Sequence, residues 1–194
     1  NKNDNVIDLY CGVGSISLYV SKYVNGVLGI EIIQEAIVDA KCNAKINNID
    51  KNSILYIWQY IKIKEIKKEL RLAMNGVVSS IQRNYGLNYK INFGVEIPRL
   101  KAIAGKFERD EELAKRLWQD NIRECKILAI FLMPEEHYKD IAEEWIKEAP
   151  FTEIADHLTM VILSKLPEAA IKALEWIQND EGMFRYCGFM TLTH

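Results

Sequence analysis

Two glycines and one glutamate near the amino terminus have the types and spacing of a nucleoside site. The stretch "VIDLYCGVGSISL" places Gly12 and Gly14 directly after a run of β-branched and aromatic residues, where a buried strand turns into a helix. Glycine at such a turn lets a ligand approach the backbone amides at the start of the helix closely. Glu31 ends the next strand-like run, "GVLGIE", where an acidic side chain accepts hydrogen bonds from ribose hydroxyls. The order of these features predicts a nucleoside ligand.

A second set of candidate residues is basic and lies between residues 62 and 109. That segment has 11 Lys and Arg against 4 Asp and Glu, whereas residues 110–194 have 9 against 17, so the net charge of -2 conceals two opposite halves. Basic side chains in series neutralise phosphates, although a solvated helix face is the commoner explanation of such charge. The residues that we expect to follow a nucleic-acid backbone are Lys62, Lys64, Lys67, Lys68, Arg71 and Arg83.

Composition excludes several other classes of protein. No apolar run reaches the roughly 18 residues that a membrane span requires, and the first residues lack the layout of a signal peptide. The four cysteines are widely spaced and there are only three histidines, so neither a disulfide framework nor a metal site is indicated. We expect a cytoplasmic protein without a membrane partner.

The elements that must position these residues change in type near Asn52. Strand-like runs and glycine turns alternate up to that point, and helical patterns dominate after it. We therefore expect two domains, a partial βαβα fragment over residues 1–52 and a helical domain over residues 53–194. Within the second, "IRECKILAIFLM" is apolar on all sides and predicts a central, buried helix.

Two stretches of the helical part resemble each other. "LMPEEHYKDIAEEWI" and "KLPEAAIKALEWI" share a proline, a following glutamate and a final Glu-Trp-Ile, and Pro134 and Pro167 are 33 residues apart. This spacing is typical of paired-helix repeats that stack into a curved solenoid. The tryptophans of both stretches are predicted to be core residues.

Residues 5 to 50 resemble a known family. "DLYCGVGSISL" and "GIEIIQEAIVDAKCNAKINNI" are similar to the S-adenosylmethionine-binding start of the RNA uracil-5-methyltransferases. The resemblance implies that Asp8, Cys11, Gly12 and Gly14 line the methionine side of that cofactor and that Glu31 holds its ribose. The family's Asp-Pro-Pro-Arg and Ser-Cys-Asn-Pro motifs are absent from this sequence, and with them the thiolate that adds to uracil. We therefore expect a packed remnant with at most weak cofactor binding.

Residues from about 65 to 194 resemble a different family, that of DNA alkylation repair proteins built from HEAT-like repeats. The similarity is carried by "MNGVVSS", "NFGVEIPRLKAIA", "LAKRLWQDNIRECKILAIFLM" and "FTEIADHLTMVIL". It implies a mainly α fold, a HEAT-like α-α solenoid that follows the short Rossmann-like fragment. It also implies a concave surface for damaged duplex DNA, and excision of cationic alkylated bases without a metal or cofactor.

The same resemblance assigns roles to individual residues. Asp156 matches the catalytic carboxylate, Thr152 stands where active members have a tryptophan, and Arg185 lies near the position of a conserved family arginine. The family's last helices are expected either to lie beyond His194 or to be missing. Asp156 is equally well explained as an ordinary helix-surface residue.

Three functions remain open from the sequence. The first is a nucleic-acid-binding module of the alkylation-repair type, with duplex DNA as partner and glycosylase activity undecided. The second is an S-adenosylmethionine-dependent RNA methyltransferase or an inactive fragment of one, joined by fusion to the helical part. The third is a helical scaffold that binds a protein on its concave face. We rank the first ahead of the third and place methyltransferase activity last.

Overall fold

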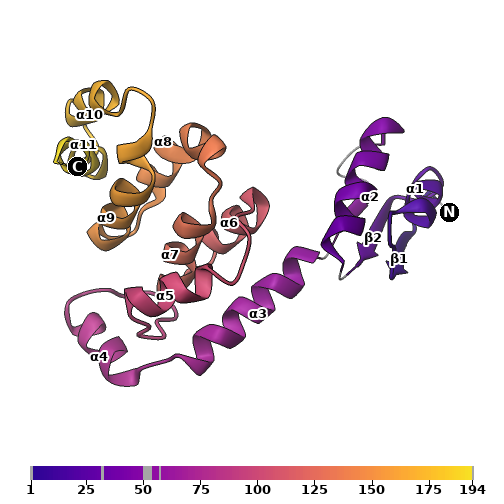
Figure 1. Cartoon of the computed structure of the whole chain (residues 1–194), viewed down its shortest axis with the longest axis horizontal. Coiled ribbons are helices and arrows are strands. Elements are labelled where there is room, and N and C mark those ends of the chain that lie inside the picture. Colours follow the sequence, from indigo (N-terminus) through magenta and orange to yellow (C-terminus); the bar gives the residue numbers. More distant parts are fainter. Residues whose placement is uncertain (1, 32, 50–53, 57, 194) are drawn as a thin grey trace. The chain divides into compact units, whose positions relative to one another are not determined.

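The chain divides into two compact units, an N-terminal unit of Asn1–Glu65 and a helical unit of Ile66–His194. The computed structural model describes residues 2–31, 33–49, 54–56 and 58–193 (Figure 1). Helix α3 (Trp58–Leu72) begins in the first unit and ends in the second.

The N-terminal unit is a small parallel sheet with helices. Strands β1 (Asn5–Leu9), β2 (Gly26–Ile30) and β3 (Ile54–Tyr56) pair in the order β1-β2-β3, and Asn5 lies opposite Gly26. Helices α1 (Ser15–Ser21) and α2 (Gln34–Ile46) form the connections. The predicted Rossmann-like βαβα fragment is confirmed, and the structure adds β3 to it.

One face of this sheet carries the core of the unit. Leu18 of α1, Val27 of β2 and Ile37 of α2 are buried in a single cluster. The side chains of Ile7 and Leu9, which alternate with half-buried positions along β1, are 61% and 63% exposed. Among the described residues of this unit, α1 and α2 cover one face of the sheet and leave Ile7 and Leu9 of the other exposed.

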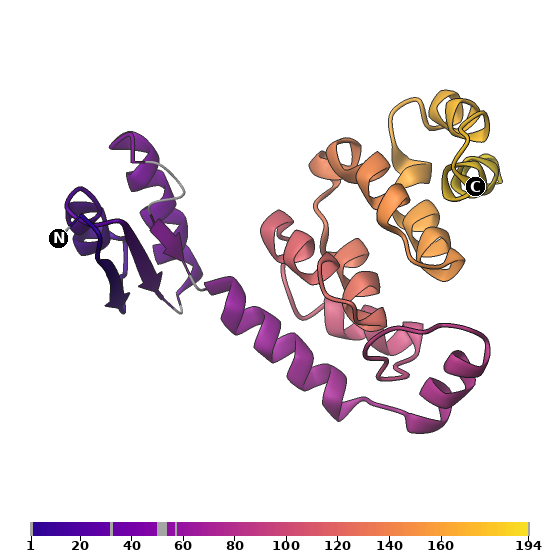
Figure 2. The ribbon, with the colours of Figure 1, turned by 180° about the vertical axis from the view of Figure 1, so that it is seen from behind.

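The helical unit consists of helices paired along the chain (Figures 1 and 2). After α3 the α-helices are α4 (Gly76–Asn84), α5 (Ile97–Ala104), α6 (Glu111–Trp118), α7 (Arg123–Leu132), α8 (Tyr138–Glu148), α9 (Thr152–Val161), α10 (Ala169–Ile177) and α11 (Gly182–Leu192). A short 3-10 turn, η1 (Glu135–His137), precedes α8, and a second, η2 (Leu163–Lys165), follows α9. The predicted mainly α, HEAT-like fold is confirmed.

Local sequence explains where several of these helices begin. Asp110 caps α6 because its carboxylate accepts a hydrogen bond from the Leu113 amide at 2.7 Å. Asn75 caps α4 in the same way, through the amides of Val77 and Val78. Pro98 lies in the first turn of α5, where a missing amide costs nothing.

Helix α7 lies at the centre of the unit, as its all-round apolar pattern predicts. It contacts α5, α6 and α9, and its buried residues run from Arg123 to Leu132. The predicted core tryptophans are also buried, and the rings of Trp118 and Trp145 stack at 4.2 Å between centroids. These contacts join α6 to α8 across one repeat.

Candidate functional site

The helices α5, α7, α9 and α11 form one row in the helical unit, each contacting the next, while α6, α8 and α10 lie along its other side (Figure 1). Polar links between successive repeats join residues that are 30 positions apart. Arg123 pairs with Glu153, Trp118 with Glu148, and Asp156 with Tyr186. The structural repeat at these contacts is thus 30 residues long. Pro134 and Pro167 are 33 residues apart because the turns that precede α8 and α10 differ.

Asp156 lies half-buried on α9, and a phenol of the next repeat holds its carboxylate. The Tyr186 hydroxyl donates a hydrogen bond to Oδ1 of Asp156 at 2.7 Å. This bond, with some burial, raises the pKa of Tyr186 to about 12. The phenol therefore remains a neutral donor at physiological pH, and it fixes the carboxylate between α9 and α11.

Aromatic and basic side chains extend the same row toward α5. The ring of His157 meets that of Phe131 edge-on with centroids 6.2 Å apart, and the Lys101 amine is 6.0 Å from the Phe131 centroid. Burial lowers the pKa of His157, so its imidazole is mainly neutral near pH 7. Four helices thus contribute to one series of carboxylate, phenol, imidazole, phenyl and amine groups.

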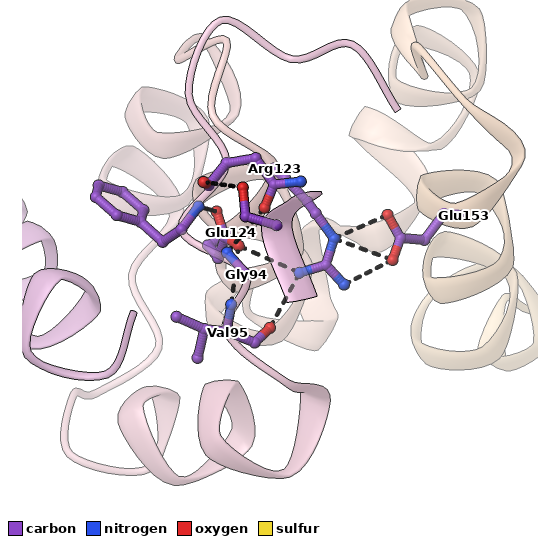
Figure 3. A network of polar contacts seen from close by, with 8 residues as sticks. Gly94, Val95, Arg123, Glu124 and Glu153 are labelled. Atoms are coloured by element: carbon purple, nitrogen blue, oxygen red, sulfur yellow. Dashed lines mark hydrogen bonds and ion pairs between the residues drawn. The ribbon is translucent and has the colours of Figure 1, made fainter. Parts of the chain in front are cut away.

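A buried ionic network sets the spacing of these helices (Figure 3). The guanidinium of Arg123, on α7, donates to both oxygens of Glu153 on α9, at 2.6 to 3.0 Å, and to the carbonyl of Val95 at 3.0 Å. Glu124 accepts hydrogen bonds from the amides of Phe93 and Val95. The loop before α5, α7 and α9 are therefore tied together one turn before Asp156.

The predicted basic residues are only partly available for phosphates. Lys67 is bound to Asp120 at 2.8 Å, and Arg185 donates to the carbonyls of Asn179 and Asp180 at 3.0 and 2.9 Å. The remaining predicted residues of the helical unit, Lys68, Arg71 and Arg83, are exposed. Lys62 and Lys64 lie on the first turns of α3, within the N-terminal unit.

The N-terminal unit brings its predicted residues together at the glycine turn. Gly12 and Gly14 both have positive φ angles, 53° and 82°, and the Gly12 amide donates to Oε2 of Glu31 at 2.9 Å. The other oxygen of Glu31 accepts from the Ile33 amide at 2.9 Å, and the side chain is buried. Glu31 thus binds the turn itself.

Asp8 and Cys11 complete this turn. Asp8 accepts a hydrogen bond from the Ser17 hydroxyl at 2.6 Å. Burial, together with the charges of Asp8 and Glu31, raises the pKa of the Cys11 thiol to about 11. The thiol is therefore protonated at neutral pH, which opposes a nucleophilic role.

The described part of the chain contains neither a cluster of metal-ligating side chains nor a membrane-length apolar helix. Its His, Cys, Asp and Glu side chains form no group of three that could hold a metal ion. Its helices include none with the length and apolar character of a membrane span.

Comparison with known proteins follows the division into two units. A family model described as DNA alkylation repair enzyme matches residues 66–194, about two thirds of the chain. The chain belongs to the DNA alkylation repair family. A solved structure titled as a new family related to the HEAT-like repeat DNA glycosylases, with affinity for branched DNA structures, is similar to this repair-family unit. It has 24% sequence identity and a TM-score of 0.60, and the match covers 66% of this chain and 55% of that one. At this identity the likeness shows the fold alone.

The other matches concern the first part of the chain. A second family model, described as tRNA (uracil-5-)-methyltransferase, matches residues 1–89 and so overlaps the repair-family model. An uncharacterised RNA methyltransferase of Oceanobacillus iheyensis is 54% identical to this chain over 50 residues, and one of Nanoarchaeum equitans is 54% identical over 54 residues. These matches cover 26% and 28% of this chain but only 11% and 12% of those relatives. The N-terminal unit is therefore a methyltransferase-like fragment, as its motifs indicate.

Sequence reasoning missed three members of the series on the helical row. Tyr186, Lys101 and Phe131 lie in stretches whose local patterns predict only helix. Once the repeat length is known to be 30, Tyr186 falls in register with Asp156. The 33-residue spacing of the prolines concealed this relation.

Proposed function

We propose that the helical unit binds duplex DNA on the exposed side of the α5, α7, α9 and α11 row. The observation that carries this proposal is the Asp156–Tyr186 pair, at 2.7 Å, in series with the aromatic and basic groups of α5 and α7. Membership of the DNA alkylation repair family supports it. The affinity for branched DNA named for the structurally similar protein is consistent with it.

Asp156 is proposed as the carboxylate that faces the sugar of the bound strand. In excision of a cationic base, the N-glycosidic bond breaks with its electron pair leaving on the base, and water adds at C1′. A fixed carboxylate stabilises the developing sugar cation and accepts the proton of that water. Asp156 is suited to this because Tyr186 holds one oxygen.

Thr152 limits how well this chemistry can proceed. It is exposed on the first turn of α9, one turn before Asp156, and its hydroxyl offers no aromatic face to a cationic base. We therefore propose DNA binding as the main function and base excision as a second, slow activity.

Phosphate contacts are proposed for the exposed basic residues of the helical unit, Lys68, Arg71 and Arg83, with Lys62, Lys64, Lys67 and Arg185 as weaker candidates. The domain division at residues 52 and 53 is kept as a proposal, with the second domain as the DNA-binding part.

The test is fluorescence anisotropy with a labelled duplex at two salt concentrations. We expect binding that weakens about tenfold or more between 50 and 200 mM salt, since several phosphates are neutralised. Base release from a duplex that carries a methylated purine is then measured for the native protein and Asp156→Asn. Release that is lost in Asp156→Asn while binding persists supports both roles. Absence of salt-dependent binding would refute the proposal.

For the N-terminal unit we propose a structural remnant with weak affinity for S-adenosylmethionine. The turn geometry fits the cofactor in one respect, because a Cβ placed on Gly12 would meet no atom within 4 Å. Glu31 fits less well, since both its oxygens accept backbone amides and its side chain is 6% exposed. If bound, the cofactor would supply an activated methyl group, with Asp8 and Cys11 near its methionine part and Glu31 near its ribose.

Titration calorimetry with S-adenosylmethionine on the whole chain tests this assignment. We expect a dissociation constant of about 1 mM or weaker, which corresponds to only about 4 kcal/mol of binding free energy. Micromolar binding that is abolished in Gly12→Val would show that the turn still works as a cofactor site.

A further inference from the structure

An open pocket of about 360 Å³ lies at the carboxyl-terminal ends of α5, α7 and α9. Its size is at the lower end of the roughly 300–1,000 Å³ that is typical of ligand sites. The lining side chains that define its chemistry are Lys101, Phe107, Arg109, Phe131, Leu132 and Val161. Two aromatic rings and two cations thus face one space, and none of the lining residues is acidic.

The positive charge around this pocket is not cancelled by its neighbours. Arg109 is held by Glu135 at 3.1 Å and by the Tyr138 hydroxyl at 3.4 Å, but Glu135 is shared with Lys165 at 3.4 Å. This cluster therefore has two cations for one carboxylate. Lys101 adds a third cation, and it is exposed at the rim. The three cations favour an anionic group at this end of the row, against the partial negative charge of the helix carboxyl-terminal ends.

The pocket adjoins the candidate site through the ring of Phe131. The Phe131 ring that lines it also contacts His157, whose neighbour in the chain is Asp156. A duplex cannot enter a space of this size with its bases paired and stacked. A single base outside the stack can, because aromatic faces accept any base and the adjoining phosphate can pair with a nearby cation.

We infer that this pocket receives one unpaired nucleotide of a DNA strand, with its base against Phe107 and Phe131 and its phosphate at Lys101. The inference rests on the proposed function, since it assumes that DNA lies on the helical row. It adds a preference for DNA with an unpaired nucleotide over a fully paired duplex, which neither Asp156 nor the basic residues of α3 and α4 provide.

The experiment compares two labelled duplexes that differ only by one unpaired nucleotide. Affinities are measured by anisotropy for the native chain, for Lys101→Gln and for Lys139→Gln as a matched control, because Lys139 is an exposed lysine on α8. We expect the native chain to bind the bulged duplex about tenfold more tightly. Lys101→Gln should lose most of this preference, and Lys139→Gln should keep it.

The alternatives give different results. Equal affinity of the native chain for the two duplexes overturns the inference and leaves the proposed function intact. A similar loss of preference in Lys101→Gln and Lys139→Gln also overturns it. Binding of neither duplex overturns the proposed function together with the inference. A third arm uses free deoxynucleoside monophosphate, and affinity for it equal to that for the bulged duplex would mean that the pocket serves a free nucleotide.

Discussion

Helix α7 of the helical unit and strand β1 of the N-terminal unit differ in how far their apolar side chains are covered. In the helical unit α7 is buried almost throughout, including the charged residues Arg123 and Glu124. In the N-terminal unit β1 leaves Ile7 and Leu9 exposed, and Ile16 and Tyr19 of α1 are also exposed. The apolar side chains of α7 are therefore covered, whereas those on one side of β1 and α1 are open to solvent.

The difference follows from how each architecture builds its core. A helical repeat packs on its neighbours in the sequence, so a short array covers its own central helices. A parallel sheet needs helices on both faces, and right-handed connections that advance in one direction place their helices on one face only. Helices α1 and α2 share a single core cluster with β2, which leaves the other face of β1 and β2 without a cover.

The largest expected effect on the free energy of unfolding comes from replacing the buried Arg123, compared with replacing an exposed arginine of the same unit. Arg123→Met should lower the free energy of unfolding of the helical unit by about 3 kcal/mol, because Glu124 and Glu153 lose their buried partner. Denaturant unfolding followed by tryptophan fluorescence measures this, since three of the four tryptophans, Trp118, Trp145 and Trp176, lie in that unit. Arg116→Met is the control.

Arg116 is exposed on α6, where its guanidinium bonds Gln119 at 3.0 Å. Its replacement should change the free energy of unfolding by less than about 0.5 kcal/mol. If Arg123→Met and Arg116→Met change the free energy of unfolding by the same amount, the Arg123 network does not stabilise the helical unit.

A matched pair of glycines compares the two units directly. Gly94 and Gly12 have similar φ angles, 69° and 53°, but a Cβ on Gly94 would overlap the Asn75 carbonyl oxygen, whereas one on Gly12 meets open space. Gly94→Ala should therefore cost about 3 kcal/mol or more, through strain and overlap. Gly12→Ala should cost only about 1 kcal/mol, through strain alone.

Thermal unfolding of each variant, with NMR signals assigned to each unit, measures these costs. The comparison between the units would fail if Gly12→Ala proved the more harmful substitution, because the turn would then be in contact with groups that the structure does not place there.

The smallest expected effect is the response to acid. Burial lowers the pKa of His157 in the folded chain, so the unfolded chain binds a proton first as the pH falls below about 6.5. Stability is then fully present above pH 6.5 and is lost as the pH falls through the folded pKa. The helical unit should become less stable from pH 7 to pH 5, by about 1 kcal/mol or less, and His157→Gln should reduce this slope. Urea unfolding at several pH values measures it.

The two units also differ in their histidine content, because His137, His157 and His194 all lie after residue 65. The N-terminal unit should therefore show no loss of stability from histidine protonation between pH 7 and pH 5. A pH slope that is unchanged in His157→Gln would assign the effect to another group.

Much of the fold was predictable because it depends on local pattern. The glycine turn at Gly12 and Gly14 and the all-round apolar run of α7 each determine an element from neighbouring residues. The candidate site was predictable only at Asp156, through family resemblance. Tyr186, Phe131 and Lys101 were not, because nothing in their own helices shows which side chains they will contact.

The sequence by itself determined two unlike units, the place of the glycine turn, the buried central helix and the two family resemblances, because periodicity and motif are properties of adjacent residues. Only the tertiary structure decided that Tyr186 binds Asp156, that Arg123 joins α7 to α9, and that Phe107 and Phe131 face one pocket with Lys101. These partners come together across successive repeats, and their register is set by the lengths of the turns and the packing of whole helices.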